Sequence, residues 1–158
     1  MYSVIALKQQ FLEKHIEQFV KIVRQVDFQY WSKENFMLPL PGKWEVSFVA
    51  VESRNTDKIV GFIICSIKNG GILYEHKLFV DSDYRNQGIG KMLLYASLSK
   101  AKKMEIETIS LNVYEESENA RNLYEGLGFI KTSQTIDNIG LRFLLKGDID
   151  AILKKLRK

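Results

Sequence analysis

Cysteine is almost absent from this chain of 158 residues, since Cys65 is the only one. A lone cysteine excludes an internal disulfide and any metal site built from several cysteines. Histidine is nearly as scarce, because only His15 and His76 occur and they lie far apart in the sequence. We therefore expect no bound metal.

Long hydrophobic runs are missing as well. The longest apolar stretches, such as residues 59–67, are much shorter than the roughly 20 residues that span a bilayer. The N-terminus also lacks a basic segment followed by an apolar one. These features predict a cytoplasmic protein with no membrane contact.

Charge of one sign is in only slight excess, with a formal net charge of +4. Much of that excess lies in the terminal residues Lys154, Lys155, Arg157 and Lys158. No basic stripe alternates with aromatic residues, so no nucleic-acid partner is expected. The hydrophobic fraction of 46% is ordinary for a globular protein and predicts one domain over residues 1–158, with residues 147–158 as a helical extension.

Hydrophobic periodicity divides the chain into strands and helices. Alternation or short apolar runs predict strands over residues 2–7, 44–52, 59–67, 72–80, 109–113, 129–135 and 141–145. Helical spacing predicts one long helix over residues 12–26 and three later helices that begin near Ile89, Ala120 and Ile149. Asn69, Gly70 and Gly71 are typical of a tight hairpin turn.

Glycines occur close together in the segment Arg85-Asn86-Gln87-Gly88-Ile89-Gly90-Lys91, between a predicted strand and a predicted helix. Such a segment lets backbone N–H groups approach an anion at the positive end of the helix dipole. A phosphate-loop NTPase would need glycine at position 85 and Ser or Thr at position 92, where Arg85 and Met92 stand. The dinucleotide fingerprint would need glycine at position 93, where Leu93 stands.

The same segment resembles the R/Q-x-x-G-x-G/A motif of the GNAT superfamily of acyl-CoA-dependent N-acetyltransferases. Residues 119–129, Asn-Ala-Arg-Asn-Leu-Tyr-Glu-Gly-Leu-Gly-Phe, resemble a second element of that superfamily, and the order of predicted elements agrees along nearly the whole chain. The resemblance implies an α+β fold with a mostly antiparallel sheet of six to seven strands, flanked by about four helices and splayed between the fourth and fifth strands. It also implies a single N-acetyltransferase domain that uses acetyl-CoA as a monomer or homodimer.

The resemblance further implies which residues contact the cofactor. Leu78, Phe79 and Val80 would present backbone groups to the pantetheine arm, and the segment from Arg85 to Lys91 would surround the pyrophosphate. Where many members carry an asparagine, this chain has Ser117, which is also a candidate helix N-cap. The implied cofactor contacts are Leu78, Phe79, Val80, Arg85, Asn86, Gln87, Gly88, Ile89, Gly90, Lys91, Ser117, Asn119 and Tyr124.

Amine acetylation needs a neutral amine, stabilisation of the developing oxyanion and a proton for the leaving thiolate. Tyr124 holds the position of the family's proton donor, although it also lies on an apolar helix face and could be a core tyrosine. The base is open between Tyr74, Glu75, His76 and water. Strand alternation places Tyr74 and His76 on one face and Glu75 on the other.

The acceptor is an amine whose identity the shared motifs do not specify. Glu115, Glu116 and Glu118 could attract a cationic amine, or they could simply be a solvated helix N-terminus. We expect a small-molecule amine rather than a protein, with Trp31 and Phe36 of the aromatic segment 27–44 lining the acceptor side; the alternative is that this segment only packs between helices. A module that binds acyl-CoA without catalysis is the competing function.

Overall fold

One seven-stranded sheet forms the centre of the molecule. The structure is a computed structural model that describes residues 1–26 and 31–157. The strand order is β1-β2-β3-β4-β5-β7-β6, and only β4 and β5 pair in parallel. The strands are β1 (Tyr2–Ala6), β2 (Phe48–Glu52), β3 (Asn55–Lys68), β4 (Ile72–Val80), β5 (Thr108–Tyr114), β6 (Ile130–Ile136) and β7 (Leu141–Asp148).

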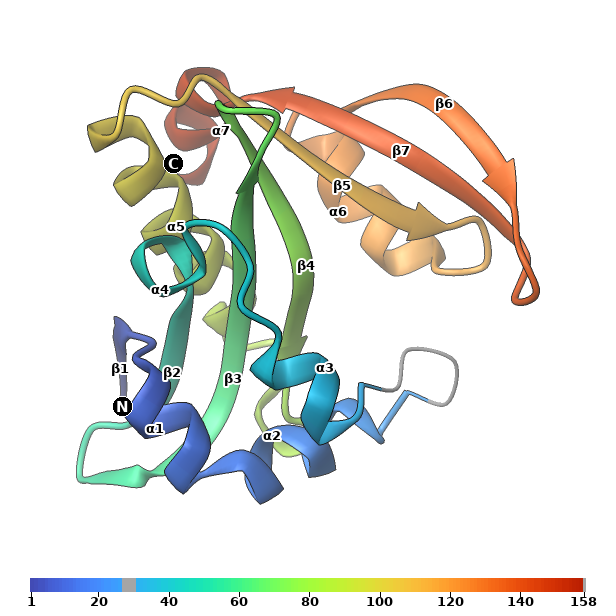
Figure 1. The fold of residues 1–158 in the computed structure, drawn as a ribbon. Coiled ribbons are helices and arrows are strands. Elements are labelled where there is room, and N and C mark those ends of the chain that lie inside the picture. Colours follow the sequence, from blue (N-terminus) through green and yellow to red (C-terminus); the bar gives the residue numbers. More distant parts are fainter. Residues whose placement is uncertain (27–30, 158) are drawn as a thin grey trace.

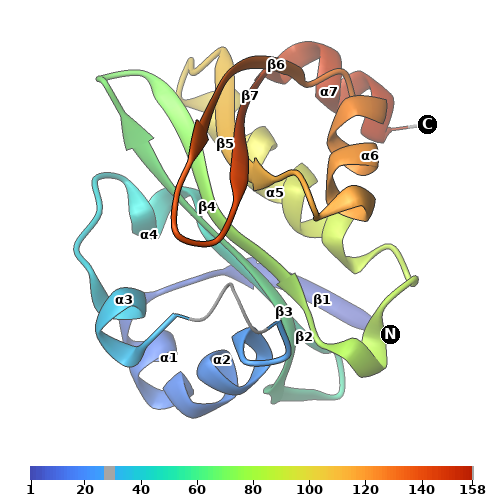
Figure 2. The same ribbon diagram turned by 90° about the vertical axis from the view of Figure 1, so that its right-hand side faces the viewer.

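Helices cover both faces of this sheet, as Figure 2 shows. The helices α1, α2 and α3 bury one face, whereas α5 and α7 pack on the other together with Tyr124 of α6. The α-helices are α1 (Gln9–Lys14), α2 (Ile16–Val23), α3 (Lys33–Met37), α4 (Lys43–Val46), α5 (Ile89–Lys103), α6 (Glu118–Gly126) and α7 (Ile149–Leu156), and a 3₁₀ turn spans Ser82–Tyr84. The predicted fold class is confirmed.

The sheet splits between β4 and β5. Their parallel pairing runs only from Ile72 opposite Thr108 to Glu75 opposite Leu111. Beyond that point β4 stays paired with β3, and β5 stays paired with β7, so the two halves diverge (Figure 1). The expected splay between the fourth and fifth strands is therefore present, and no described strand pairs with the segment from His76 to Val80 on its β5 side.

A β-bulge interrupts β4 where the split begins. Ile64 pairs with Lys77 and Cys65 pairs with Glu75, so His76 is the extra residue. A bulge changes which face the following side chains occupy. Glu75 precedes the extra residue and faces the core beneath α5 and α6, as strand alternation predicts. The His76 ring approaches Trp31 on the other face, with ring centroids 6.2 Å apart.

The predicted long helix over residues 12–26 is wrong, because the chain forms two helices, α1 and α2, that meet at His15. His15 is buried and leaves helical geometry, with φ −111° and ψ 17°. Its Nε2 lies 3.3 Å from Asp57 Oδ1, and its ring packs on Phe11. Both helices bury apolar residues in the same core. The helical spacing of apolar residues therefore continues through His15, and it does not reveal the break.

The predicted strand start at Trp44 is also wrong. Trp44 lies in α4, and β2 begins at Phe48. The buried Lys43 ammonium donates hydrogen bonds to the carbonyl oxygens of Phe36 and Leu38, which holds this helical turn against the end of α3. The short helices α3 and α4 raise the number of helices above the expected four. They were not predicted because side-chain hydrogen bonds hold them and they show no hydrophobic periodicity.

The predicted hairpin turn between β3 and β4 is confirmed. Asn69 and Gly70 have positive φ values of 51° and 74°. That one sheet runs from Tyr2 to Asp148 agrees with a single domain, which stays a prediction for the full protein.

Candidate active site

A groove of about 680 Å³ runs between β4 and α6 and ends at the start of α5. We call it the β4–α6 groove. Its walls combine the unpaired part of β4 with the glycine segment and the first turn of α6. The lining residues are Val26, Leu78, Phe79, Val80, Tyr84, Arg85, Asn86, Gly88, Ile89, Gly90, Glu116, Ser117, Glu118, Asn119, Ala120, Leu123 and Tyr124.

The glycine segment gives this groove an anion-binding end. Asn86 and Gly88 both have positive φ, at 63° and 80°, and Gly88 is the N-cap of the 15-residue helix α5. A Cβ atom added at Gly88 would meet nothing within 4 Å, so its backbone borders open space. Free backbone N–H groups and the helix dipole at such a terminus suit a phosphate group.

Not every predicted cofactor contact lines this groove. The Gln87 side chain accepts a hydrogen bond from the Tyr2 hydroxyl. Lys91 lines a separate hollow between β1, α5 and α7. Arg85 does border the groove, and its Nε donates to the Val80 carbonyl oxygen at 3.2 Å.

Ser117 and Asn119 lie on the α6 wall of the groove. Ser117 is the N-cap residue of α6, as predicted, but its side chain makes no capping hydrogen bond. Its hydroxyl is therefore not committed to the helix terminus, and Glu116 and Glu118 flank it along the groove.

A second hollow of about 360 Å³ adjoins the groove, and we call it the Tyr74 pocket. It shares Leu78, Ala120 and Tyr124 with the β4–α6 groove, so the two hollows meet at these residues. Its lining residues are Trp31, Tyr74, Glu75, His76, Lys77, Leu78, Asn112, Val113, Tyr114, Ala120, Tyr124, Ile139 and Arg142. All four predicted catalytic residues are thus brought together around one space.

Tyr124 and Glu75 form a buried pair at the junction of the two hollows. The Tyr124 hydroxyl donates to Glu75 Oε2 at 2.7 Å. Burial raises the pKa of Glu75 to about 7, although the hydrogen bond from Tyr124 partly opposes this shift. Burial, and then the nearby Glu75 charge, raise the pKa of Tyr124 well above its usual range. Tyr124 therefore stays protonated near neutrality, whereas Glu75 is about half protonated at pH 7 and mostly protonated below it.

Tyr74 and His76 lie side by side on the opposite face, with ring centroids 4.7 Å apart. His76 Nε2 is 2.7 Å from the Ser66 hydroxyl. Burial, together with the charges of Lys68, Lys43 and Lys77, lowers the pKa of His76 to about 4. His76 is neutral at physiological pH.

Asn112 is a site residue that was not predicted from the sequence; its side-chain amide donates a hydrogen bond to the Tyr74 hydroxyl. Asn112 lies on β5, where the apolar residues Ile109, Leu111 and Val113 alternate with it. Its position in the middle of a central strand could have indicated a site residue. An amide on the face of β5 opposite the apolar residues needs a polar partner when it is buried.

Phe36 does not lie where the sequence analysis expected. It is fully buried in the core beneath α1 and α2, where its ring packs against Phe19 and Phe62. Trp31 does line the Tyr74 pocket, and its ring stands edge-on to Phe36 at 5.2 Å. Phe36 therefore supports Trp31 from behind. Residues 27–30 of the aromatic segment lie outside the described residues.

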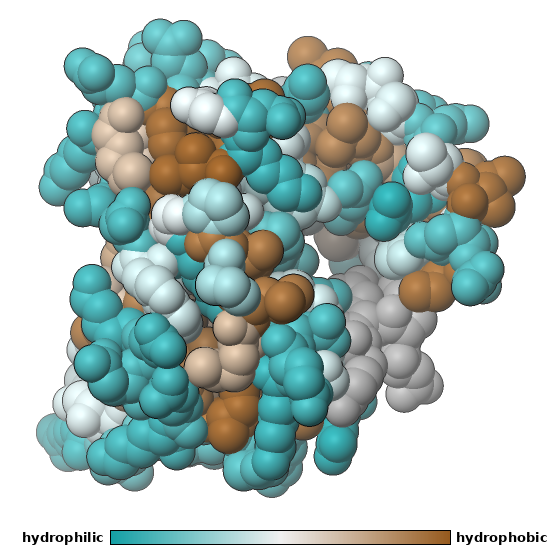
Figure 3. All heavy atoms as spheres, in the orientation of Figure 1, coloured by the Kyte–Doolittle hydropathy of each residue, from teal (hydrophilic) through white to brown (hydrophobic). Residues whose placement is uncertain are grey.

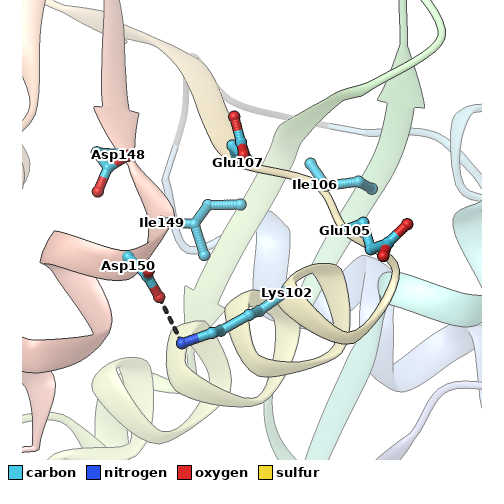
Figure 4. A pocket seen from close by; sticks show the side chains of 7 residues that line it. All are labelled: Lys102, Glu105, Ile106, Glu107, Asp148, Ile149 and Asp150. Carbon is cyan, nitrogen blue, oxygen red and sulfur yellow. Dashed lines mark ion pairs between the residues drawn. The ribbon is translucent and has the colours of Figure 1, made fainter.

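A third hollow lies at the other end of β5, formed by the end of α5 and the start of α7 (Figure 4). Its acidic side chains Glu105, Glu107 and Asp148 are spread around the opening, and Asp150 forms an ion pair with Lys102 at 2.5 Å. None of the predicted site residues borders it. Over residues 1–26 and 31–157, no group of three or more His, Cys, Asp or Glu side chains could hold a metal ion.

The surface seen in Figure 3 carries its hydrophobic side chains in separate patches, one of them over the β6–β7 hairpin. The exposed large hydrophobic residues of that hairpin are Ile130, Ile136 and Ile139. None of the helices described above has the length and the hydrophobicity that crossing a bilayer requires.

Comparison with known proteins finds a match to the model of the acetyltransferase (GNAT) family over residues 9–129. N-alpha-acetyltransferase 30 of Saccharomyces cerevisiae is 31% identical over 127 residues, which cover 73% of this chain and 70% of that protein. The peptidyl-lysine N-acetyltransferase YjaB of Escherichia coli is 33% identical over 94 residues, which cover 59% of this chain and 56% of that protein. The chain therefore spans little more than half of the second relative.

Among solved structures, the NatC complex bound to Gag peptide and CoA contains a similar chain. The TM-score is 0.80 at 26% sequence identity, and the match covers 93% of this chain and 98% of that one. The matched family segment includes both sequence motifs, the β4–α6 groove from Leu78 onward and most of the Tyr74 pocket.

Proposed function

Since the chain belongs to the acetyltransferase (GNAT) family, we propose that it transfers the acetyl group of acetyl-CoA to a primary amine of a peptide or protein. The chain is an acetyl-CoA-dependent N-acetyltransferase; the nature of the acceptor is the proposal. The observation that carries the proposed course of the transfer is the position of Tyr124, which borders both the β4–α6 groove and the Tyr74 pocket.

The β4–α6 groove fits CoA chemically. Residues Asn86 to Gly90 would hold the pyrophosphate at the N-terminus of α5, where positive φ values turn the backbone around open space. The unpaired part of β4, from Leu78 to Val80, would offer backbone hydrogen bonds to the amide-rich pantetheine arm. Acetyl-CoA supplies the acetyl group as a thioester, an activated form with a thiolate leaving group.

Tyr124 would supply the proton to the leaving sulfur. A positioned acid must stand within hydrogen-bond reach of the atom that gains the proton. The junction of the two hollows is the place where a thioester in the groove and an amine in the pocket would meet. This location favours a catalytic Tyr124 over a tyrosine that only packs in the core.

The amine would enter from the Tyr74 pocket. Tyr74, whose hydroxyl accepts a hydrogen bond from Asn112, is the group we propose to orient the amine, and the proton of the amine would pass to water. His76 is neutral and hydrogen-bonded to Ser66, which suits a positioning role. Lys77 and Arg142 border the same pocket, and nearby positive charge favours the neutral, nucleophilic form of an amine.

A peptide or protein acceptor is favoured by the relatives, whose names describe α-amine and peptidyl-lysine acetylation. The small-molecule acceptor expected from the sequence has no support from these relatives. The Tyr74 pocket borders Ile139 of the protruding β6–β7 hairpin, and all residues of β6 are exposed. An extended chain could therefore reach the pocket along this hairpin.

An acceptor panel tests this proposal. We would measure CoA thiol release with peptides carrying a free N-terminus, with N-blocked peptides carrying one lysine, and with polyamines, amino sugars and amino acids at matched concentrations. We expect kcat/KM for at least one peptide class to exceed that of every small amine by about tenfold or more. Turnover of a small amine with no turnover of either peptide class would overturn the peptide acceptor while leaving the enzyme class intact.

A further inference from the structure

Glu75 is a buried carboxyl group, and only one of its two oxygens has a hydrogen-bond partner among the described residues. It is 7% exposed, and Tyr124 is 6% exposed. Oε2 accepts the Tyr124 hydroxyl at 2.7 Å, but Oε1 is buried and has no partner among the described residues. An ionised carboxylate with an unsatisfied buried oxygen is costly, whereas a neutral carboxyl group can use one of its oxygens as a donor.

The groups that face Glu75 do not compensate a negative charge. From β3, the buried Cys65 thiol approaches it, and burial raises the pKa of that thiol so that it stays neutral. From α5, Ser97 donates its hydroxyl to the Cys65 sulfur at 3.3 Å. From α6 comes Tyr124, and the β5 residue opposite Glu75 is the apolar Leu111. On β4 itself, the neighbouring rings of Tyr74 and His76 occupy the other face.

No salt bridge joins Glu75 to a cation of the described chain. Burial is the main influence on its pKa, which lies near 7 rather than at the ordinary 4.5. Within residues 1–26 and 31–157, the only titratable hydroxyl that reaches Glu75 is that of Tyr124, the proposed donor to the leaving sulfur.

We infer that Glu75 is a positioning residue for Tyr124. In its neutral form, and from the core side of the Tyr124 hydroxyl, it orients this hydroxyl and supplies it with a proton. When Glu75 is neutral, its carboxyl O–H would donate to Tyr124 Oη across the same 2.7 Å contact, in place of the bond that the Tyr124 hydroxyl donates to the carboxylate. The Tyr124 proton is then turned toward the junction of the two hollows. The inference rests on the proposed role of Tyr124 in acetyl transfer. It assigns Glu75 to the thiolate side of the reaction, and not to the amine as a base.

The protons balance as follows. When the carbon–sulfur bond breaks, its electron pair stays on sulfur, and Tyr124 gives its hydroxyl proton to that sulfur. Glu75 gives its proton to Tyr124 Oη and becomes a carboxylate. Acetylation of an ammonium releases one proton overall, and a proton taken up from water restores neutral Glu75 before the next turnover.

Ionisation of Glu75 would reverse the direction of the hydrogen bond. The carboxylate can only accept, so it would hold the Tyr124 proton away from the sulfur. The rate of the chemical step should then fall as pH rises through the apparent pKa of Glu75. A base that deprotonates the amine would give the opposite dependence, with the rate rising through the same pH range.

The test compares wild type with Glu75→Gln in single-turnover kinetics at saturating acceptor between pH 5.5 and 9, a range chosen to bracket that pKa. Glutamine keeps a neutral N–H donor toward Tyr124 but has no proton to give. We expect the variant to be slower than wild type by about tenfold or more near pH 6 and to lose the decline that wild type shows at high pH. Wild-type activity of the variant near pH 6, or a wild-type decline of the variant at high pH, would overturn the inference.

A measurement without cofactor separates this inference from the proposed function. The Glu75 carboxyl carbon would be titrated by NMR in the apo protein, with exposed Glu45→Gln as a matched control variant that leaves the titration unchanged. We expect an apparent pKa near 7 that rises further in Tyr124→Phe, because that variant loses a hydrogen bond to the carboxylate. A Glu75 pKa near 4.5 would refute the inference even if acetylation is confirmed, and lack of acetylation would leave this titration interpretable.

Discussion

Tyr124 is the residue on which the proposed chemistry depends. Its ring packs edge-on against Phe129 at 5.2 Å in the core, and its hydroxyl lies where the groove and the pocket meet. One side chain therefore combines a packing role with a polar role. The buried bond to Glu75 means that stability alone cannot distinguish the two roles.

Replacing Tyr124 by phenylalanine keeps the ring and removes the proton donor. We expect a loss in kcat of about 10²-fold, at the low end for positioned acid catalysis because water can partly substitute. The free energy of unfolding should fall by about 1–3 kcal/mol, since Glu75 loses its hydrogen-bond donor. Stopped-flow kinetics and urea unfolding would measure the two effects. A folded variant with wild-type rate in a rate-limiting chemical step would leave Tyr124 with only a packing role.

For single residues, the sequence predicted the face of a helix or strand that a side chain occupies better than it predicted the residue that the side chain contacts. Helical spacing placed Tyr124 correctly on the apolar face of α6, and strand alternation correctly separated Glu75 from Tyr74. That Glu75 meets Tyr124, and that Tyr74 meets Asn112, depends on which helix packs over each face of β4. Such pairings join residues that are 38 and 49 positions apart, and local patterns carry no information about them.

The N-terminus of α5 is the element that the sequence described most fully. The glycine segment was predicted between a strand and a helix, and positive φ at Gly88 gives the physical reason for glycine there. By contrast, the break at His15 and the helices α3 and α4 depend on the contacts of His15 and Lys43 with distant chain segments. These elements could not be predicted from periodicity.

Gly88→Val tests the anion-binding role of this helix terminus. The side chain would enter the space that the phosphate needs, and we expect CoA affinity to fall by at least about tenfold in isothermal titration. Positive φ also strains valine, so stability should drop. Gly70→Val is the matched control, because Gly70 has a similar φ of 74° and equally open surroundings but lies in the β3–β4 turn. Equal CoA affinity in both variants would contradict the assignment.

At the scale of the whole molecule, the split sheet creates two buried environments at one point of β4. Glu75 faces the core beneath α5 and α6, and His76, the extra residue of the bulge, faces Trp31. Burial disfavours the charged form of both groups, so it raises the pKa of the acid Glu75 and lowers the pKa of the base His76. The family resemblance predicted the split, and strand alternation predicted the opposite faces of these two neighbours, whereas their burial and their partners depend on the three-dimensional arrangement.

This arrangement predicts opposing pH effects on stability. The folded pKa of Glu75 lies near 7, above its ordinary 4.5, so the unfolded state releases the proton first and stability falls as pH rises from 4.5 to 7. The folded pKa of His76 lies near 4, below its ordinary 6.5, so stability rises as pH goes from 4 to 6.5. The two trends overlap between pH 4.5 and 6.5 and should largely cancel in the wild-type protein.

Replacing either Glu75 or His76 should reveal the pH dependence of stability that the other residue produces. In Glu75→Gln we expect stability to rise with pH between 4 and 6.5, and in His76→Gln we expect it to fall between 4.5 and 7. At about 1.4 kcal/mol for each unit of pKa shift, the Glu75 contribution could reach about 3 kcal/mol. Urea unfolding of the apo proteins, followed by circular dichroism across this pH range, measures these slopes. Parallel stability curves for wild type and Glu75→Gln would mean that Glu75 titrates alike in both states, because only a difference between its folded and unfolded pKa values can change the slope.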